Sequence, residues 1–303
     1  MEKLIIDAHS HLWLNQDTVV DNQRICQLEP NRSRSLFFGE ERQMLPPYMI
    51  DGQNTAERFL SNMDYAQVAA AVVTQEFIDG IQNSYLIQVA NRYPERFFTF
   101  GMLDYRNAGF MEVAPSVVDA FKGIKIPAAR LPQHFLTTEM MQLMHQLEDK
   151  GKILGIELQD GDAQTGQMEE IIEECPKLKI AIGHFGMVTR PGWLEQIKLA
   201  RHENVFIESG GITWLFNDEF YPFPSAVRAI KEAAELVGME KLMWGSDYPR
   251  TITAITYKMS YDFIEKTSEL TADEKQLFLG QNAKKFFGFG ELPNLPYIKN
   301  MSE

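Results

Sequence analysis

Two histidines separated by one small residue, His9 and His11, follow a short apolar run near the start of the chain. Side chains of a β-strand alternate between its two faces, so both imidazoles are expected on the same side of a strand that begins near Leu4. Two imidazoles on one face can hold a metal ion or a substrate oxygen. A His-x-His pair is a weak motif, and it equally describes two polar residues where a strand meets a loop.

The elements that would position this pair are eight short apolar runs with helical patterns between them. The predicted strands are residues 4–8, 68–74, 97–103, 123–126, 153–158, 179–183, 205–208 and 242–245. They are mostly continuous apolar runs rather than alternating ones, as expected for parallel strands covered on both sides. Eight alternations predict an α/β protein, a single-domain (β/α)8 TIM barrel over residues 1–303. The alternative, a doubly wound open sheet, lacks a Gly-x-Gly-x-x-Gly after the first strand.

A barrel of this kind places its catalytic residues at the C-terminal ends of the strands and in the loops that follow. Further polar residues occupy such positions on strands four, five, six and eight, and they are Lys125, Arg130, Gln159, His184, Asp247 and Arg250. Together with the strand-one pair, they predict one site built from several strands. Glu157 and Glu208 end strands five and seven, but the pattern does not decide whether they face the barrel interior or the helices.

Charge and composition restrict the function further. The net charge is −13, which argues against nucleic acid or an anionic membrane as a partner. Hydrophobic residues make up 45% of the chain, which is ordinary for a globular protein, and the expected partner is a small-molecule substrate. No run approaches the length of a membrane span, the first residues do not resemble a signal peptide, and Cys26 and Cys175 form no disulfide framework. These features predict a cytoplasmic protein.

Three motifs carry a family resemblance. Asp7-Ala-His-Ser-His11, Ile182-Gly-His-Phe-Gly186 and Met243-Trp-Gly-Ser-Asp-Tyr-Pro249 resemble the amidohydrolase superfamily, and more narrowly its amidohydrolase-related branch, often called amidohydrolase 2. The resemblance runs through nearly the whole chain and implies the TIM barrel. The branch contains lactonases of sugar acids and pyrone dicarboxylates, and also non-oxidative decarboxylases.

The resemblance also implies roles for residues. It assigns His9, His11 and Asp247 to one divalent metal ion, with zinc expected, and Asp247 also to general-base catalysis. His184 matches a histidine of the branch that binds substrate or metal, or helps to move a proton. One departure concerns strand five, where metal-binding decarboxylases of the branch usually carry a histidine and this chain has Gln159. Some lactonases of the branch lack that histidine, and some of those work without metal. The departure therefore favours a lactonase and weakens the metal assignment.

Four residues are predicted to bind substrate. Gln159 can hydrogen-bond a hydroxyl or carbonyl group, and Lys125, Arg130 and Arg250 can face negative charge. For the two arginines, a solvated surface position is an equal alternative. Lys125 could instead be a carboxylated, metal-bridging lysine, as in other amidohydrolase branches, but a Gly-x-Lys at this strand is common in the branch without that role.

A long segment, residues 13–53, follows the first strand and is predicted to be a loop insertion at the catalytic mouth. It forms either a wall or lid of the site or a subunit interface of a homo-oligomer. The resulting prediction is a hydrolase that opens the ring of a small polar lactone, derived from a sugar or carboxylic acid, by water attack with Asp247 as base. The alternatives are a metal-dependent decarboxylase of a small unsaturated or aromatic acid and an inactive binding protein.

Overall fold

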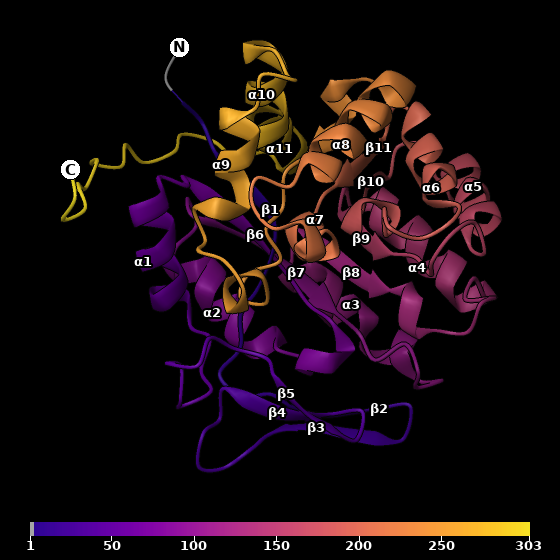
Figure 1. The fold of residues 1–303 in the computed structure, drawn as a ribbon. Helices are drawn as coiled ribbons and strands as arrows, with labels where there is room; N and C mark the ends of the chain where they lie inside the picture. Colours follow the sequence, from indigo (N-terminus) through magenta and orange to yellow (C-terminus); the bar gives the residue numbers. More distant parts are fainter. Residues whose placement is uncertain (1–2) are drawn as a thin grey trace.

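The computed structural model describes residues 3–303 and contains an eight-stranded parallel barrel (Figure 1). Its strands follow one another around the barrel in chain order: β1 (Ile6–His11), β6 (Ala70–Thr74), β7 (Phe97–Met102), β8 (Gly123–Pro127), β9 (Ile153–Glu157), β10 (Lys179–Ile182), β11 (Val205–Glu208) and β12 (Leu242–Met243). Backbone hydrogen bonds from Ala8 to Trp244 and from His11 to Tyr248, 2.8 and 2.7 Å long, join the first strand to the segment that follows β12. The predicted TIM barrel is confirmed.

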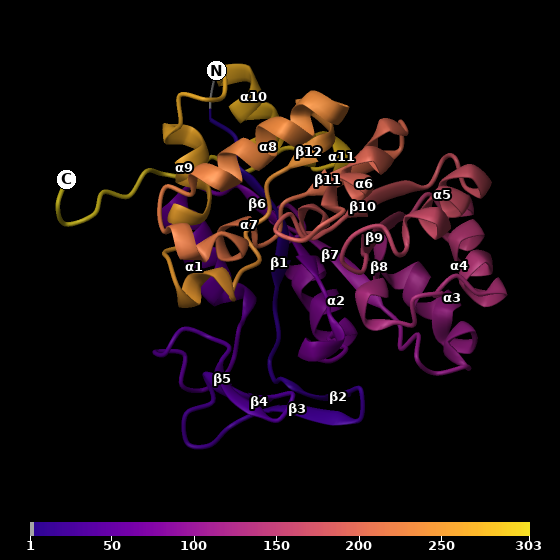
Figure 2. The same cartoon turned by 45° about the vertical axis from the view of Figure 1, so that its right-hand side comes forward.

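Helices surround the barrel (Figures 1 and 2). They are α1 (Ala56–Ala66), α2 (Asn83–Arg92), α3 (Phe110–Ala120), α4 (Thr138–Asp149), α5 (Thr165–Glu174), α6 (Trp193–Lys198), α7 (Ile212–Leu215), α8 (Pro224–Val237), α9 (Met259–Lys266), α10 (Ala272–Gln276) and α11 (Asn282–Phe287). Phe286 and Phe287 of α11 pack with Phe98, Phe100 and Ile6 in the core inside the barrel. This packing fills the barrel at the N-terminal end of the strands, so a site can open only at their C-terminal end.

The first strand ends later than predicted. The expected strand covered residues 4–8, but β1 extends to His11, so both histidines lie within the strand. Its partners supply the reason, because Ser10 and His11 pair with β6 and Ser10 also forms a bridge with Tyr248. These partners lie far away in sequence and could not be read from the local apolar pattern.

The insertion is more ordered than the loop that was expected. It contains a four-stranded antiparallel sheet formed by β2 (Asp17–Val20), β3 (Gln23–Gln27), β4 (Arg34–Phe37) and β5 (Glu40–Gln43). The sheet projects from the barrel beside α1 and α2 (Figures 1 and 2). Because these strands have only four or five residues each and mix polar with apolar side chains, they lack the apolar run by which the barrel strands are recognised.

Among residues 3–303, no helix combines the length and the apolar character that crossing a membrane requires.

Candidate active site

A β-bulge in β1 turns the two histidines into the barrel. Ile6 and Ala8 belong to the interior core, so strict alternation would direct His9 and His11 toward the helices. The pairing register instead advances by three residues in β1, from Asp7 to Ser10, against two residues in β6. The extra residue reverses the alternation above the bulge. His9 and His11 thereby share the interior face, with their Nε2 atoms 3.0 Å apart.

Carboxylates orient both imidazole rings. His9 Nδ1 lies 2.6 Å from Glu208 Oε1, and His11 Nδ1 lies 2.9 Å from Asp79 Oδ2. With the Nδ1 atoms facing carboxylates, the Nε2 atoms of both rings point into the barrel, toward each other and toward Asp247. Burial lowers the pKa of His9 despite the opposing charge of Glu208, which keeps that ring neutral and able to act as a ligand.

Two glycines make room for His9. A Cβ atom at Gly210 would lie 2.6 Å from His9 Cγ, and one at Gly245 would lie 2.7 Å from His9 Cβ. Side-chain atoms do not approach so closely without displacement. Gly245, which belongs to the strand-eight motif, therefore leaves the space that His9 of the first strand occupies.

Asp247 completes this group of donor atoms. Its Oδ1 atom lies 3.1 Å from His11 Nε2 and 3.7 Å from His9 Nε2, and Trp214 Nε1 donates a 2.8 Å hydrogen bond to Oδ2. Burial alone would raise the pKa of Asp247, but the hydrogen bond with His11 and the charge of Arg250 hold it well below its usual range. Its backbone has φ +58°, a left-handed conformation that costs free energy and is typical of functional positions.

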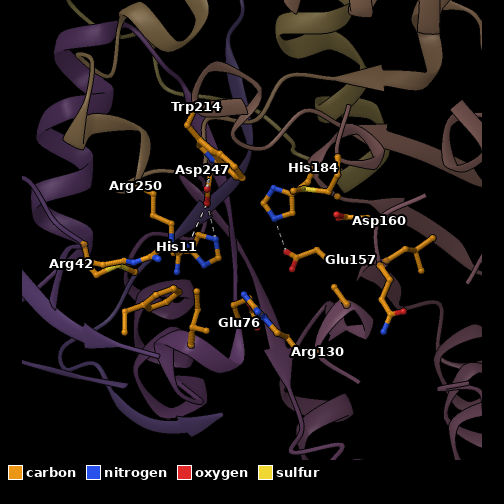
Figure 3. Close-up of a pocket in the computed structure, with 18 of the residues that line it drawn as sticks. His11, Arg42, Glu76, Arg130, Glu157, Asp160, His184, Trp214, Asp247 and Arg250 are labelled. Carbon is orange, nitrogen blue, oxygen red and sulfur yellow. Dashed lines mark hydrogen bonds and ion pairs between the residues drawn. The ribbon is translucent and has the colours of Figure 1, made fainter. Parts of the chain in front are cut away.

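A second group lies across the pocket from Asp247 (Figure 3). His184 Nε2 lies 3.2 Å from Glu157 Oε1, and Lys125 Nζ lies 2.7 Å from the same oxygen. Since His184 Nδ1 is 2.8 Å from the carbonyl oxygen of Gly210, both ring nitrogens face acceptors. Burial disfavours the charged ring, but the Glu157 carboxylate outweighs it and raises the pKa of His184 to about 9.

The donor set fits a divalent metal ion. His9 Nε2, His11 Nε2 and Asp247 Oδ1 are 3.0 to 3.7 Å apart, and tetrahedral zinc with bonds of about 2 Å separates its ligand atoms by roughly 3.3 Å. Two imidazoles and a carboxylate are ligands that zinc accepts. His9, Glu157 and His184 form an adjoining set of donors whose ligand atoms also lie within 4.8 Å of one another.

A pocket of about 700 Å³ opens above these groups. The barrel contributes His11, Glu157, His184 and Asp247 to its lining, and the insertion contributes Phe37, Arg42, Gln43 and Met44. Figure 3 shows Arg42 near His11 and Arg130 near Glu76. The insertion is therefore part of the pocket wall.

The four residues predicted to bind substrate are placed differently from one another. Gln159, Arg130 and Arg250 line the pocket, whereas Lys125 is buried outside its lining. Gln159 donates a 3.0 Å hydrogen bond from its amide to the carbonyl oxygen of Leu131.

Each pocket arginine has a carboxylate partner. Arg130 Nε lies 2.9 Å from Glu76 Oε2, and Arg250 Nη2 lies 2.6 Å from Asp79 Oδ1. The positive charge at these positions is therefore largely neutralised before any substrate enters.

Several site residues were not identified from the sequence. Glu157 and Glu208, whose direction the apolar pattern does not decide, both face the interior. Asp79, Glu76 and Trp214 also belong to the site, although no sequence motif singles them out. Glu76 and Asp79 follow the second barrel strand, so the strand-end rule that selected His184 would have reached them as well. Trp214 follows the seventh strand, in a stretch rich in aromatic residues at positions 212–223, and this richness is the signal that could have found it.

Known proteins share the fold of this chain. The family model described as Amidohydrolase matches residues 6–289. No curated protein sequence matches the chain significantly. Among solved structures, the chain is similar to a probable 2-pyrone-4,6-dicarboxylic acid hydrolase from Acinetobacter baumannii, with a TM-score of 0.69 and 18% identity, covering 94% of this chain and 99% of that one.

Two other structures show the range of activities on this fold. An amidohydrolase from Burkholderia multivorans with bound zinc has a TM-score of 0.68 and 16% identity, covering 96% of this chain and 100% of that one. The 5-carboxyvanillate decarboxylase from Sphingomonas paucimobilis has a TM-score of 0.59 and 18% identity, covering 80% and 86%. Similarity at these identities establishes the shared fold, and one fold hosts several chemistries.

Proposed function

We propose, from the premise that this chain belongs to the amidohydrolase family, that it opens the ring of a small polar lactone by adding water to the acyl carbon. The observation that carries the proposal is the Asp247 carboxylate, which lies at the pocket wall beside two imidazole Nε2 atoms and is held ionised. An ionised carboxylate in this position can accept a proton from water.

The reaction uses the residues on both sides of the pocket. The water oxygen bonds to the acyl carbon while one water proton passes to Asp247, and the ring C–O bond then breaks. The same proton passes to the alkoxide that leaves. The product is a hydroxy acid, which is ionised at neutral pH and therefore releases one proton to solvent. His184, which carries a proton at neutral pH, faces the pocket where it can stabilise negative charge on the carbonyl oxygen.

A metal ion would assist this chemistry. A divalent ion held by His9, His11 and Asp247 would polarise the carbonyl and make the attacking water more acidic. This assistance matters because a carboxylate with a lowered pKa is by itself a weak base. The zinc-bound Burkholderia relative supports metal dependence.

The charge of the pocket supports a substrate that is polar rather than strongly anionic. Arg130 and Arg250 already have buried carboxylates as partners. A neutral lactone needs no free cation, whereas a decarboxylase substrate carries its own carboxylate. The alternative, a metal-dependent decarboxylase, is supported by the similarity to 5-carboxyvanillate decarboxylase.

Labelled water separates the two activities. We expect purified enzyme in ¹⁸O-water to place one label in the product carboxylate of a turned-over lactone and to release one proton per turnover. Mass spectrometry of the product measures the label. Release of carbon dioxide from a carboxylated substrate, with no label at an acyl carbon, would contradict the lactonase and identify the decarboxylase.

Metal content provides a second test. We expect the His11→Ala variant to contain one divalent ion per chain fewer than the wild type, measured by elemental analysis of both proteins, because the variant loses one of three ligand atoms. His202→Ala is the matched control, since His202 lies on the surface with Glu169 as its partner. An unchanged content in His11→Ala, or a loss of two ions, would refute a single-ion site at these residues.

The insertion offers a test of its part in substrate binding. Arg42 and Arg34 both lie in this sheet and both pair with a glutamate, but only Arg42 lines the pocket. We expect Arg42→Ala to raise the KM for the substrate with little change in kcat, and Arg34→Ala to leave both constants near their wild-type values. Equal effects of the two substitutions would show that the insertion does not contact the substrate through Arg42.

A further inference from the structure

A second cluster of metal-ligating side chains lies outside the barrel, where α4 packs beside α5. His145 and Glu148 are one helical turn apart on α4, and Cys175 follows the last residue of α5. Cys175 Sγ lies 3.4 Å from His145 Nδ1, and the three residues bring one ligand atom each to within 4.8 Å of the others. The thiol is buried, Glu148 is half-buried and His145 is exposed.

We propose that His145, Glu148 and Cys175 form a second metal site, which takes a single divalent ion of the zinc type and is separate from the barrel site. In a tetrahedral zinc site the sulfur and nitrogen ligands are about 3.5 Å apart, given bonds of roughly 2.3 and 2.0 Å. The sulfur–nitrogen separation here matches that value. The exposed side of His145 leaves the fourth position to water.

The surrounding charges favour a cation. Burial, together with Glu148, Glu174 and Asp149, raises the pKa of the Cys175 thiol to about 11, because a thiolate would add negative charge to an acidic region. A divalent cation reverses this balance. On binding, the Sγ–H bond breaks, its proton goes to solvent, and Sγ bonds to the ion.

Glu148 is held in place for this role. Its Oε1 atom accepts a 2.6 Å hydrogen bond from the backbone N–H of Lys177, which anchors the carboxylate. The anchored carboxylate keeps one oxygen within 4.8 Å of the ligand atoms of His145 and Cys175. Hydrogen bonds to ligating carboxylates orient them in the same manner in other metal sites.

Sulfur makes the two sites distinguishable by spectroscopy. The barrel site has only nitrogen and oxygen donors. Cys26, the other cysteine of the chain, belongs to β3 of the insertion. A thiolate-to-metal charge-transfer band therefore reports the site at α4 and α5, whichever ions occupy the barrel.

The experiment is a titration of the full-length protein with cobalt(II) alone, in the presence of a phosphine reductant. We expect a near-ultraviolet sulfur-to-cobalt band that saturates at one thiolate-bound ion per chain and disappears in Cys175→Ser. In His145→Ala we expect the band to be lost or to need a much higher cobalt concentration. Cys26→Ser is the matched control and should titrate like the wild type.

Three outcomes would overturn the proposal. They are no charge-transfer band in the wild type, a band that survives in Cys175→Ser, and a band with unchanged affinity in His145→Ala, which would mean that the thiol binds without the cluster. The His145 variant keeps the test decisive if Cys175→Ser fails to fold, because an exposed side chain contributes little to the core. Far-ultraviolet circular dichroism verifies that each variant is folded.

Discussion

Asp247→Asn will reduce turnover by about 10²–10⁴-fold, the range typical of losing a general base, while leaving the substrate Kd close to that of the wild type. Asparagine keeps the size of the side chain and retains an oxygen that can accept the hydrogen bond from Trp214 Nε1. It removes the charge that accepts a proton. Single-turnover kinetics give the rate of the chemical step, and calorimetric titration with substrate under slow turnover gives the Kd.

Asp160→Asn is the control for this substitution. Asp160 also lines the pocket, but it is exposed and pairs with Arg190 on the surface at 3.3 Å. We expect it to change the rate far less than Asp247→Asn does. If Asp247→Asn turned over at the wild-type rate, or lost as much in Kd as in rate, Asp247 would be a binding residue and not the base.

Lys125→Met will lower the free energy of unfolding by about 3–5 kcal/mol, the usual cost of removing one member of a buried ion pair. Lys125 is 2% exposed and Glu157 is 5% exposed, and the 2.7 Å contact between Lys125 Nζ and Glu157 Oε1 is buried in the barrel. Without the ammonium group, His184 is the remaining partner that offsets the buried negative charge of Glu157. Urea denaturation followed by circular dichroism measures the change.

Two further variants separate the buried charge from other effects of the substitution. Adding Glu157→Gln to Lys125→Met removes the uncompensated charge, so the double variant should regain much of the lost stability. Lys150→Met, which breaks an exposed pair with Asp119, should cost no more than about 1 kcal/mol. Equal losses in Lys125→Met and Lys150→Met would show that the inner pair does not stabilise the barrel.

The barrel was predictable from the sequence because each strand is buried on both faces. Apolar runs such as residues 68–74 and 97–103 alternate with helical patterns eight times, and the glycine motif expected of the alternative, a doubly wound sheet, is missing. Each predicted strand is matched by a strand of the barrel, with ends that differ by a few residues. The strand-end rule, applied to the same pattern, selected His184 and Asp247, and the structure places both at one pocket.

The same burial explains what the sequence left open. Where both faces of a strand are apolar, the pattern does not tell which face lines the interior, so the inward direction of Glu157 and Glu208 became visible only in the folded chain. The pairing of Lys125 with Glu157 joins residues 32 positions apart, and that of His9 with Glu208 joins residues 199 apart.

The insertion and the first strand depended on distant partners in the same way. The four strands of the insertion are too short to show a periodic apolar pattern, yet residues of β4 and β5 line the pocket. The bulge in β1 has no local signature, because it arises from the register with β6. The sequence by itself determined the barrel and the residue types of its site, whereas strand register and long-range pairing decided which of those residues face one another.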